Sequence, residues 1–582
     1  MNGNVTQLHA GPLSVDFDNG DLRGVRLGTT ELIRRIYMVF QDRNWTSRPW
    51  VIDDVAITKS DVSFTVRFTA QGTFDASNFT WDCIIEGTPE GLITYTVTGG
   101  TSVPFVRNRL GLCVLHPMEL AGAQVEIEHS LGSRDTTIFP LEISPYQPFT
   151  DISAMTHPIS DTLRARLELT GEVFETEDHR NWGDASFKTY CTPISLPFPV
   201  TVQPDEKFQQ SVSLSLLGPV HITSAPVEGA IIEVFPTASP LPRIGLQIGP
   251  LAISVRQTSL LQDLRLDHLR VDIDATAADS GIARLTDAAA QARAIGCSLH
   301  VAIFDADESA LNQLSQYNRE VDDVVSMWFI FHADEKVTSS SSINQARRAL
   351  GPQAVIAGGT NMYFTELNRQ PPDTSLIDVV NFSLNPQVHS FDERTIFSNA
   401  STAMVIAENA PRLAGNALIS ISPITLRPRF NPNATDPAAD VSNDQFPASD
   451  DQRQPTWLAA AWTALSLGFI SAPGTIASVT YFETVGPRGI IDAETDQPYP
   501  VYDFLAAIAG YTHMYPCASN QPQEIDALVL SRLEENLLVM INMTDRERDV
   551  SIAGMFTKAV TAQPHGLTII NLPGGRNVTD II

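Results

Sequence analysis

The sequence is poor in cysteine. Its 582 residues include five cysteines, and no two of them have the Cys-x-x-Cys spacing. Structural zinc sites usually need that spacing, and an odd number of scattered cysteines argues against a disulfide framework. We therefore expect a protein of a reducing compartment, the cytoplasm. The cysteines are Cys83, Cys113, Cys191, Cys297 and Cys517.

Positive charge is also scarce. The chain has 38 Lys and Arg residues against 67 Asp and Glu residues, which leaves a formal net charge of −29, and it contains no basic run. A nucleic-acid backbone or an anionic membrane surface would be repelled by this charge. We expect neither as a partner.

Long apolar runs are missing as well. The longest one, WLAAAWTALSLGFI from Trp457 to Ile470, is shorter than the roughly 20 residues that cross a bilayer and predicts a buried helix. The opening MNGNVTQLHAGPL lacks the basic and apolar regions of a secretion signal. The composition of the whole sequence, with 43% hydrophobic and 18% charged residues, is typical of a globular protein. Its length predicts roughly three or four domains.

The first part of the chain, residues 1–225, is predicted to be an N-terminal antiparallel β-sandwich. Segments such as DVSFTVRFTA and GLITYTVTGG alternate apolar and polar residues and are separated by Gly, Asn and Asp. This alternation is typical of antiparallel sheets with one face in water. By analogy, the sandwich is of the large kind found in sugar-processing enzymes.

A different pattern begins near residue 240. Short apolar strands followed by helical stretches predict a (β/α)8 TIM barrel over residues 240–515. Helical stretches that end in Gly, such as GIARLTDAAAQARAIG, support this prediction. Residues 520–582 predict a small C-terminal β region packed on the barrel or the sandwich, so the fold class is α/β plus β. The eight predicted strands begin at Arg243, His268, Ser298, Val324, Ala354, Asp378, Ala417 and Ser478.

Candidate site residues are the polar ones at the carboxyl ends of the barrel strands, where such barrels carry their active sites. In the second strand, alternation places Arg270, Asp272 and Asp274 on one face, pointing into the barrel. Buried charges are costly unless they pair with each other or with a ligand. The two interpretations are an internal Arg–Asp pair and a ligand-binding group.

The other strand ends carry Asn, Gln, His, Arg and carboxylate side chains. Such a mixture suits a polyhydroxylated ligand, because each hydroxyl needs a donor and an acceptor, although any single residue could be a cap or turn. Glu483, which ends the eighth strand, is the candidate nucleophile, acid or base, and His389 is the candidate general base or oxyanion donor. Arg429 follows the seventh strand, and Arg488 follows the eighth. The predicted substrate-binding residues of the barrel are Arg270, Asp272, His332, Asn361, Asn385, Arg427 and Tyr481.

Metal-binding motifs are not present. The sequence has neither a His-x-His nor a His-Glu-x-x-His spacing. We therefore predict no metal site and no cofactor.

The sandwich contributes one stretch without strand alternation, from Phe174 to Lys188 (FETEDHRNWGDASFK). A solvent-exposed loop would rarely carry both a Trp and a Phe among its charges. We predict that this loop forms a wall of the barrel's active-site mouth; the alternative is that it only joins the domains. Its predicted substrate-binding residues are Glu177, Asp178, Arg180, Asn181, Trp182 and Lys188.

Several of these segments resemble the D-apionate lactonase family. They are IRRIYMVFQDRNW, RLGLCVLHP, ETEDHRNWGDASFKTY and, after the sixth strand, LNPQVHSFD, and the likeness extends over nearly the whole chain. The resemblance implies hydrolysis of a branched-sugar lactone, D-apionolactone, to D-apionate in bacterial apiose breakdown. The ligand would be a small sugar-acid lactone, and a homo-oligomer is compatible with the sequence. No catalytic residue is carried over from the family.

One departure from the glycosidase pattern bears on mechanism. Retaining glycosidases of the large barrel clan carry a Glu at the ends of strands four and seven, about 5 Å apart. Here those strands run into Phe331-His332-Ala333 and Ser420-Ile421-Ser422-Pro423. Opening a lactone needs one base, oxyanion donors and a proton for the alkoxide. A sugar lactonase is the first hypothesis, a glycoside hydrolase acting on a furanoside or plant glycan the second, and a non-catalytic carbohydrate-binding protein the third.

Overall fold

The computed structural model divides the chain into two compact units. The first comprises residues up to 180 and from 185 to 220, and the second comprises residues 181–184 and most of the chain from 229 onward. The structure describes residues 5–45, 47, 49–74, 77–204, 206–220, 229–276, 278–320, 324–430, 449–533, 535–553 and 559–572.

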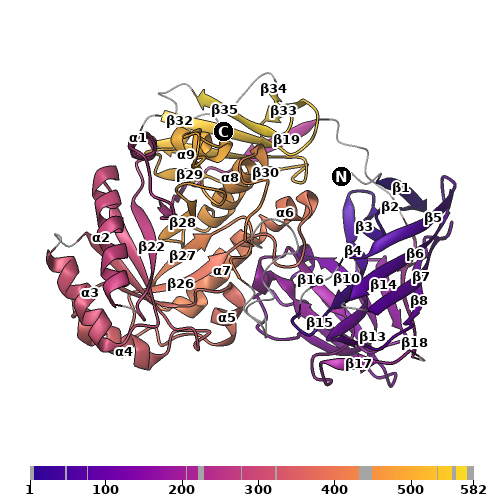
Figure 1. The fold of residues 1–582 in the computed structure, drawn as a ribbon. Coiled ribbons are helices and arrows are strands. Elements are labelled where there is room, and N and C mark those ends of the chain that lie inside the picture. Colours follow the sequence, from indigo (N-terminus) through magenta and orange to yellow (C-terminus); the bar gives the residue numbers. More distant parts are fainter. Residues whose placement is uncertain are drawn as a thin grey trace. The chain divides into compact units, whose positions relative to one another are not determined.

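The first unit is one antiparallel sheet of 16 strands, drawn in indigo and purple in Figure 1. Fourteen of them follow one path, β1-β2-β3-β4-β10-β16-β15-β13-β14-β18-β8-β7-β6-β5, and β11 and β12 branch from β13. The strands are β1 (Thr6–Ala10), β2 (Leu13–Asp18), β3 (Asp21–Leu27), β4 (Thr30–Gln41), β5 (Val51–Lys59), β6 (Phe64–Phe74), β7 (Ser77–Gly87), β8 (Ile93–Thr101), β10 (Arg109–Pro117), β11 (Gln124–His129), β12 (Arg134–Ile138), β13 (Phe149–Pro158), β14 (Arg164–Thr170), β15 (Phe174–Asp178), β16 (Ser186–Tyr190) and β18 (Lys207–Leu217).

The predicted sandwich is confirmed by the way this sheet encloses one apolar core. In β2 the side chains of Leu13, Val15 and Phe17 are buried and the intervening ones are half-exposed, as alternation requires. Aromatic rings fill the centre, with Phe79 and Trp81 edge to face at 4.8 Å. Two short strands, β9 (Phe105–Arg107) and β17 (Val200–Val202), pair with each other, and two 3-10 turns are η1 (Met118–Leu120) and η2 (His179–Trp182).

The second unit contains a closed parallel barrel of eight strands, so the predicted TIM barrel is confirmed. The strands follow one another in chain order, and the last pairs with the first. All eight predicted strands are present. They are β21 (Arg243–Gln247), β22 (His268–Asp274), β23 (Ser298–Phe304), β24 (Val325–Phe331), β25 (Ile356–Gly359), β26 (Val379–Leu384), β27 (Leu418–Ile424) and β28 (Ser478–Glu483).

Helices connect these strands, and their ends carry the expected capping residues. Ser254 and Gln257 form a capping box at the start of the first helix. Gly296 and Gly351 follow two helices with φ of 88° and 92°, which glycine adopts without strain. The helices are α1 (Val255–Asp263), α2 (Ala278–Ile295), α3 (Glu308–Glu320), α4 (Ser340–Leu350), α5 (Phe364–Arg369), α6 (Glu393–Asn399), α7 (Thr402–Ala414), α8 (Trp457–Ser471) and α9 (Pro500–Ala507).

Two small sheets complete the second unit and confirm the C-terminal β region. Their strand orders are β30-β19-β33-β34 and β20-β29-β31-β32-β35, and they share one apolar cluster. The first strand of the unit, which precedes the barrel in the chain, pairs in parallel with β33. The strands are β19 (Ala230–Val234), β20 (Ser239–Pro240), β29 (His513–Tyr515), β30 (Cys517–Ser519), β31 (Ile525–Arg532), β32 (Glu535–Asn542), β33 (Arg548–Ile552), β34 (Val560–Ala562) and β35 (Gly566–Leu572).

Helix α8 is buried on nearly every side, which explains its uniformly apolar sequence. It packs between helices α7 and α9 of the barrel and strands β31, β32 and β35 of the C-terminal sheet. A helix with two packed faces has no polar stripe. Across the described residues, the structure contains no helix whose length and apolar character would let it cross a membrane.

Candidate active site

A cavity of about 190 Å³ opens beside the carboxyl ends of β21, β22, β27 and β28. Its wall combines three carboxylates and three guanidinium groups with amide and hydroxyl groups. This is the end of the barrel at which the sequence predicts the site. The lining residues are Gln247, Asp272, Thr425, Leu426, Arg427, Arg429, Ser449, Asp451, Gln454, Phe482, Glu483, Pro487 and Arg488.

Glu483 is the titratable group of this cavity with a raised pKa. The residue is only 8% exposed, and Arg488 Nη2 lies 2.7 Å from its Oε1. Burial raises the pKa of Glu483 above its ordinary value; Arg488 opposes that shift, and the charges of Asp450 and Asp272 add to it. A carboxylate with a raised pKa is a stronger base once it is ionised, and it can also return the proton.

A β-bulge directs Glu483 into the cavity. Tyr481 and Glu483 pair with consecutive residues of β21, the second being Gln247, so Phe482 is the extra residue and has a φ of 42°. Without the bulge, residues 481 and 483 would point to the same face of the strand. Instead, the hydroxyl of Tyr481 lies 2.9 Å from Ser466 Oγ of α8, and the carboxylate of Glu483 lines the cavity. Positive φ for an aromatic residue is strained and is typical of functional sites.

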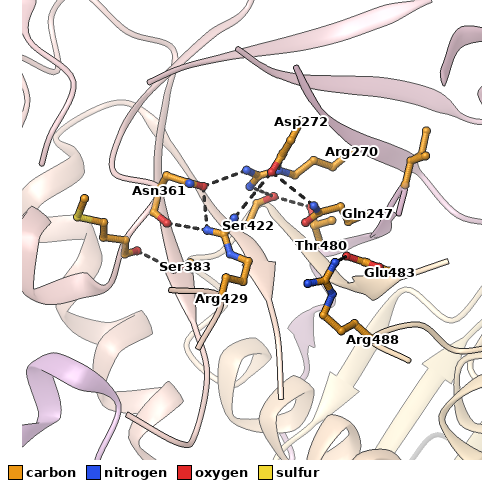
Figure 2. A network of polar contacts seen from close by, with 12 residues as sticks. Gln247, Arg270, Asp272, Asn361, Ser383, Ser422, Arg429, Thr480, Glu483 and Arg488 are labelled. Carbon is orange, nitrogen blue, oxygen red and sulfur yellow. Dashed lines mark hydrogen bonds and ion pairs between the residues drawn. The ribbon is translucent and has the colours of Figure 1, made fainter. Parts of the chain in front are cut away.

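Beside Glu483, two arginines converge on one amide and one carboxylate, as Figure 2 shows. Arg270 donates from Nε to Asp272 Oδ1 at 2.8 Å and from Nη2 to Asn361 Oδ1 at 3.0 Å. Arg429 donates from Nη2 to the same Asn361 oxygen at 2.9 Å, and its Nη1 lies 3.8 Å from Asp272 Oδ2. Arg270 also donates to Ser422 Oγ at 3.1 Å. The network joins the ends of β22 and β27 with the segment after β25.

The rim of the cavity contains a second ionic group. Arg427 donates to the carbonyl of Asp450 at 3.0 Å, and Asp451 accepts from Arg453 Nη2 and from Gln387 Nε2, both at 2.8 Å. Burial by itself would raise the pKa of Asp451, but the hydrogen bonds from Arg453 and Gln387 outweigh burial and lower the pKa to about 2. Asp451 is therefore ionised at neutral pH, and it holds the side chains of Arg453 and Gln387 in place at the rim.

The predicted barrel residues fall into two groups. Asp272, Arg427 and Glu483 line the cavity, and Arg270 and Asn361 hold its wall from behind. The other four are engaged elsewhere in the second unit. His332 Nδ1 lies 3.7 Å from Asp305 Oδ1, Asn385 Oδ1 accepts from the backbone N–H of Gln387 at 3.0 Å, Tyr481 contacts α8, and His389 Nδ1 lies 2.6 Å from Asp184 Oδ2.

Residues of the 174–188 stretch are distributed over both units. In the first unit, Glu177 Oε1 lies 3.1 Å from Lys188 Nζ, and Arg180 pairs with Asp178 at 2.7 Å while donating to the carbonyl of Pro140 at 2.8 Å. In the second unit, Asn181 Oδ1 accepts from Asn368 Nδ2 at 2.9 Å, and the ring of Trp182 stands edge to face with His389, with ring centroids 5.6 Å apart. None of the six belongs to the lining of the cavity.

Asp267, His268 and His300, at the amino ends of β22 and β23, form a cluster with metal-ligand atoms. The two imidazoles are stacked with centroids 3.7 Å apart and planes 14° apart. A ring nitrogen binds a metal in the plane of its ring, so two stacked rings cannot direct their lone pairs at one ion. Burial lowers the pKa of both histidines, and His268 Nε2 lies 2.9 Å from Thr480 Oγ1. We interpret the two histidines as neutral rings packed inside the barrel.

Five polar lining residues are not predicted from the sequence, and one of them, Thr425, directly follows β27. Gln247 is the last residue of β21 and donates to Asp272 Oδ2 at 3.4 Å, so the strand-end rule could have selected it. Ser449, Asp451 and Gln454 precede α8 and follow no strand directly. Nothing in their local sequence distinguishes them from capping or turn residues.

Comparison with known proteins identifies two matching family models. Residues 2–219 match "D-apionate lactonase, N-terminal domain" and residues 244–513 match "D-apionate lactonase, TIM barrel domain". A D-apionate lactonase of Brucella anthropi is 28% identical over 600 aligned residues, which cover 97% of this chain and 96% of that protein.

Two solved structures are similar to this chain over more than half of its length. A GH30 endoxylanase from Clostridium papyrosolvens C71 has a TM-score of 0.40 and 11% identity, covering 60% of this chain and 97% of its own. A 4-O-α-L-rhamnosyl-β-D-glucuronidase from Fusarium oxysporum 12S has a TM-score of 0.40 and 9% identity, covering 59% and 96%.

Proposed function

The chain belongs to the D-apionate lactonase family, and on that premise we propose that it hydrolyses a five-membered sugar lactone to the corresponding aldonate. The specific substrate that we propose is D-apionolactone, opened to D-apionate in the bacterial breakdown of the branched pentose. A family of lactonases implies a hydrolase, and the cavity of the barrel supplies the groups that this reaction needs.

The observation that carries the proposal is the position of Glu483 in the cavity wall, buried, with a raised pKa and next to cationic groups. In the proposed reaction the ionised carboxylate takes a proton from water as the water oxygen bonds to the lactone carbonyl carbon. When the ring C–O bond breaks, Glu483 returns that proton to the ring oxygen. The acid that forms then loses its own proton to solvent, so the net reaction consumes one water.

A glycoside hydrolase is the second candidate, because Asp272 brings a second carboxylate into the cavity of Glu483. A glycosidase needs one carboxyl that donates a proton to the leaving group and one that acts as nucleophile or base. Asp272 is held by Arg270 at 2.8 Å and faces Arg429 at 3.8 Å. An oxocarbenium-like transition state in this cavity would be repelled by the two cations. The cavity therefore favours lactone opening.

A paired assay tests the proposal. Proton release from a panel of five-membered sugar lactones is followed with a pH indicator, and release of nitrophenol from a panel of nitrophenyl glycosides is followed in parallel. We expect turnover of lactones only, with D-apionolactone as the best substrate, and the same rate after dialysis against a chelator. Glycoside turnover without lactone turnover would support the glycosidase, and affinity without turnover in either panel would support a binding protein.

A further inference from the structure

Arg270 and Arg429 together carry more positive charge than the carboxylate that they contact can neutralise. Arg270 is fully buried, and the side chain of Arg429 is 17% exposed. Within the described part of the chain, the carboxylate that both contact is the same one, that of Asp272. Their other shared partner, Asn361 Oδ1, is a neutral amide oxygen. Two guanidinium groups therefore share one negative charge.

Arg429 is the member of this pair that reaches the cavity. It lines the cavity wall, whereas Arg270 lies behind it. Its Nη2 is engaged by the backbone and side-chain oxygens of Asn361, at 2.6 and 2.9 Å. Its Nη1 is 3.8 Å from Asp272 Oδ2, which is too long for a hydrogen bond. A ligand oxygen can take that position.

We propose that Arg429 forms an anion subsite that binds the carbonyl oxygen of the lactone and, after ring opening, the carboxylate of the product. Arginine suits this role because its planar fork matches a carboxylate and carries a permanent charge. Burial, together with repulsion from Arg270, lowers the pKa of Arg429 to about 10, against the attraction of Asp272, so the group stays protonated at neutral pH.

The catalytic role of this subsite rests on the proposed function. The subsite adds to that function because it favours one class of reaction over another. When water adds to a lactone carbonyl, the carbonyl oxygen acquires a negative charge, which an under-neutralised guanidinium stabilises. When a glycosidic bond breaks, the sugar ring acquires positive charge, which the same guanidinium destabilises. The charge imbalance of Arg270 and Arg429 thus favours lactones over glycosides of the same sugar.

A binding comparison on the intact chain tests the subsite without relying on turnover. Calorimetry measures the affinity for the aldonate made by alkaline opening of the lactone and for the neutral alditol with the same carbon skeleton. We expect the wild-type protein to bind the aldonate at least tenfold more tightly. Equal affinities would overturn the subsite whatever the lactone assay shows, and this comparison needs no variant.

Substitution then assigns the preference to one residue. Arg429→Gln should abolish the preference for the aldonate, leave alditol binding within about twofold, and lower kcat on the lactone by roughly 10²- to 10³-fold, as loss of an oxyanion donor does. The control is Arg348→Gln, on α4, whose side chain is 61% exposed and pairs with Glu308. A preference that persists in Arg429→Gln would overturn the assignment. A preference that disappears in a protein without lactone turnover would support the subsite and refute the proposed function.

Discussion

The carboxylate of Glu483 packs closely against Gly249: a Cβ atom built on residue 249 would lie 2.7 Å from Glu483 Oε2. Gly249 follows β21, and Glu483 ends the neighbouring β28. The absence of a side chain at 249 therefore leaves the space that the carboxylate occupies. A side chain at residue 249 would push the carboxylate of Glu483 out of its position.

Gly249→Ala should displace the carboxylate and lower kcat on the lactone by about tenfold or more, because small misplacements of a reacting group are costly. KM should change little. The control is Gly468→Ala in α8, where the nearest atoms to the new Cβ would be 3.9 Å away and the helix should gain stability. Steady-state kinetics of both variants measure kcat and KM, and thermal melts show whether each variant is folded. A kcat within twofold of wild type for Gly249→Ala would contradict the proposed role of Glu483 or its dependence on position.

Glu483→Gln should lower kcat by about 10²- to 10⁴-fold, because it keeps the acceptor for Arg488 but removes the group that exchanges the proton. In the wild type, kcat should rise with pH through an apparent pKa above the ordinary 4.5 of a Glu. The variant should lack this limb. Glu320→Gln, at the exposed end of α3, is the control. If the Gln variant keeps more than about a third of the activity, the proton is exchanged by a group other than Glu483.

The raised pKa of Glu483 also predicts a stability effect. An acid whose pKa is raised by folding stabilises the fold while it is protonated, and this contribution is lost as pH rises through the raised pKa. At neutral pH the ionised Glu483 therefore costs stability. We expect Glu483→Gln to melt at the same or a higher temperature than the wild type at pH 7, which also shows that its loss of activity is not unfolding. A lower melting temperature would show that the carboxylate stabilises this region.

Arg180→Ala should lower stability rather than substrate affinity. The guanidinium is buried, pairs with Asp178 at 2.7 Å and donates to the carbonyl of Pro140, so its removal leaves a buried carboxylate without this partner. Breaking such a pair typically costs about 3–5 kcal/mol. Urea unfolding measures this cost, with Arg134→Ala, whose side chain is 56% exposed, as the control. A tenfold rise in KM in a variant of unchanged stability would instead support the wall of the active-site mouth that the sequence suggests.

Asp526, in the C-terminal sheet, should make stability depend on pH. Burial raises its pKa to about 7, although the backbone N–H of Ala527 donates to it and opposes the shift. Because the folded-state pKa is the higher one, the stabilising contribution is present below about pH 4 and is lost as pH rises toward 7. Asp526→Asn should therefore match the wild type near pH 4 and exceed it at pH 8, by on the order of 4 kcal/mol at most. Urea midpoints at the two pH values measure the difference, and equal midpoints at pH 8 would contradict it.

Local sequence patterns are sufficient to predict the strands of the barrel and its most apolar helix. The eight barrel strands were predicted from apolar runs, and α8 from a uniformly apolar segment, because burial on one or two faces leaves a periodic signature in neighbouring residues. The candidates Glu483 and Asp272 follow from the same strands, since the strand end places a polar residue at the mouth of a barrel.

What the residues do at those positions was decided by tertiary contacts. The bulge at Phe482 sends Tyr481 toward α8 and Glu483 into the cavity, and it is visible only in the pairing of β28 with β21. Strand β19 joins a sheet with β33, a strand from the far end of the chain. Arg429 reaches Asn361 from a segment 68 residues away. Contacts between residues distant in the chain leave no local period, so only the folded chain reveals which charges share a partner and which retain room for a ligand.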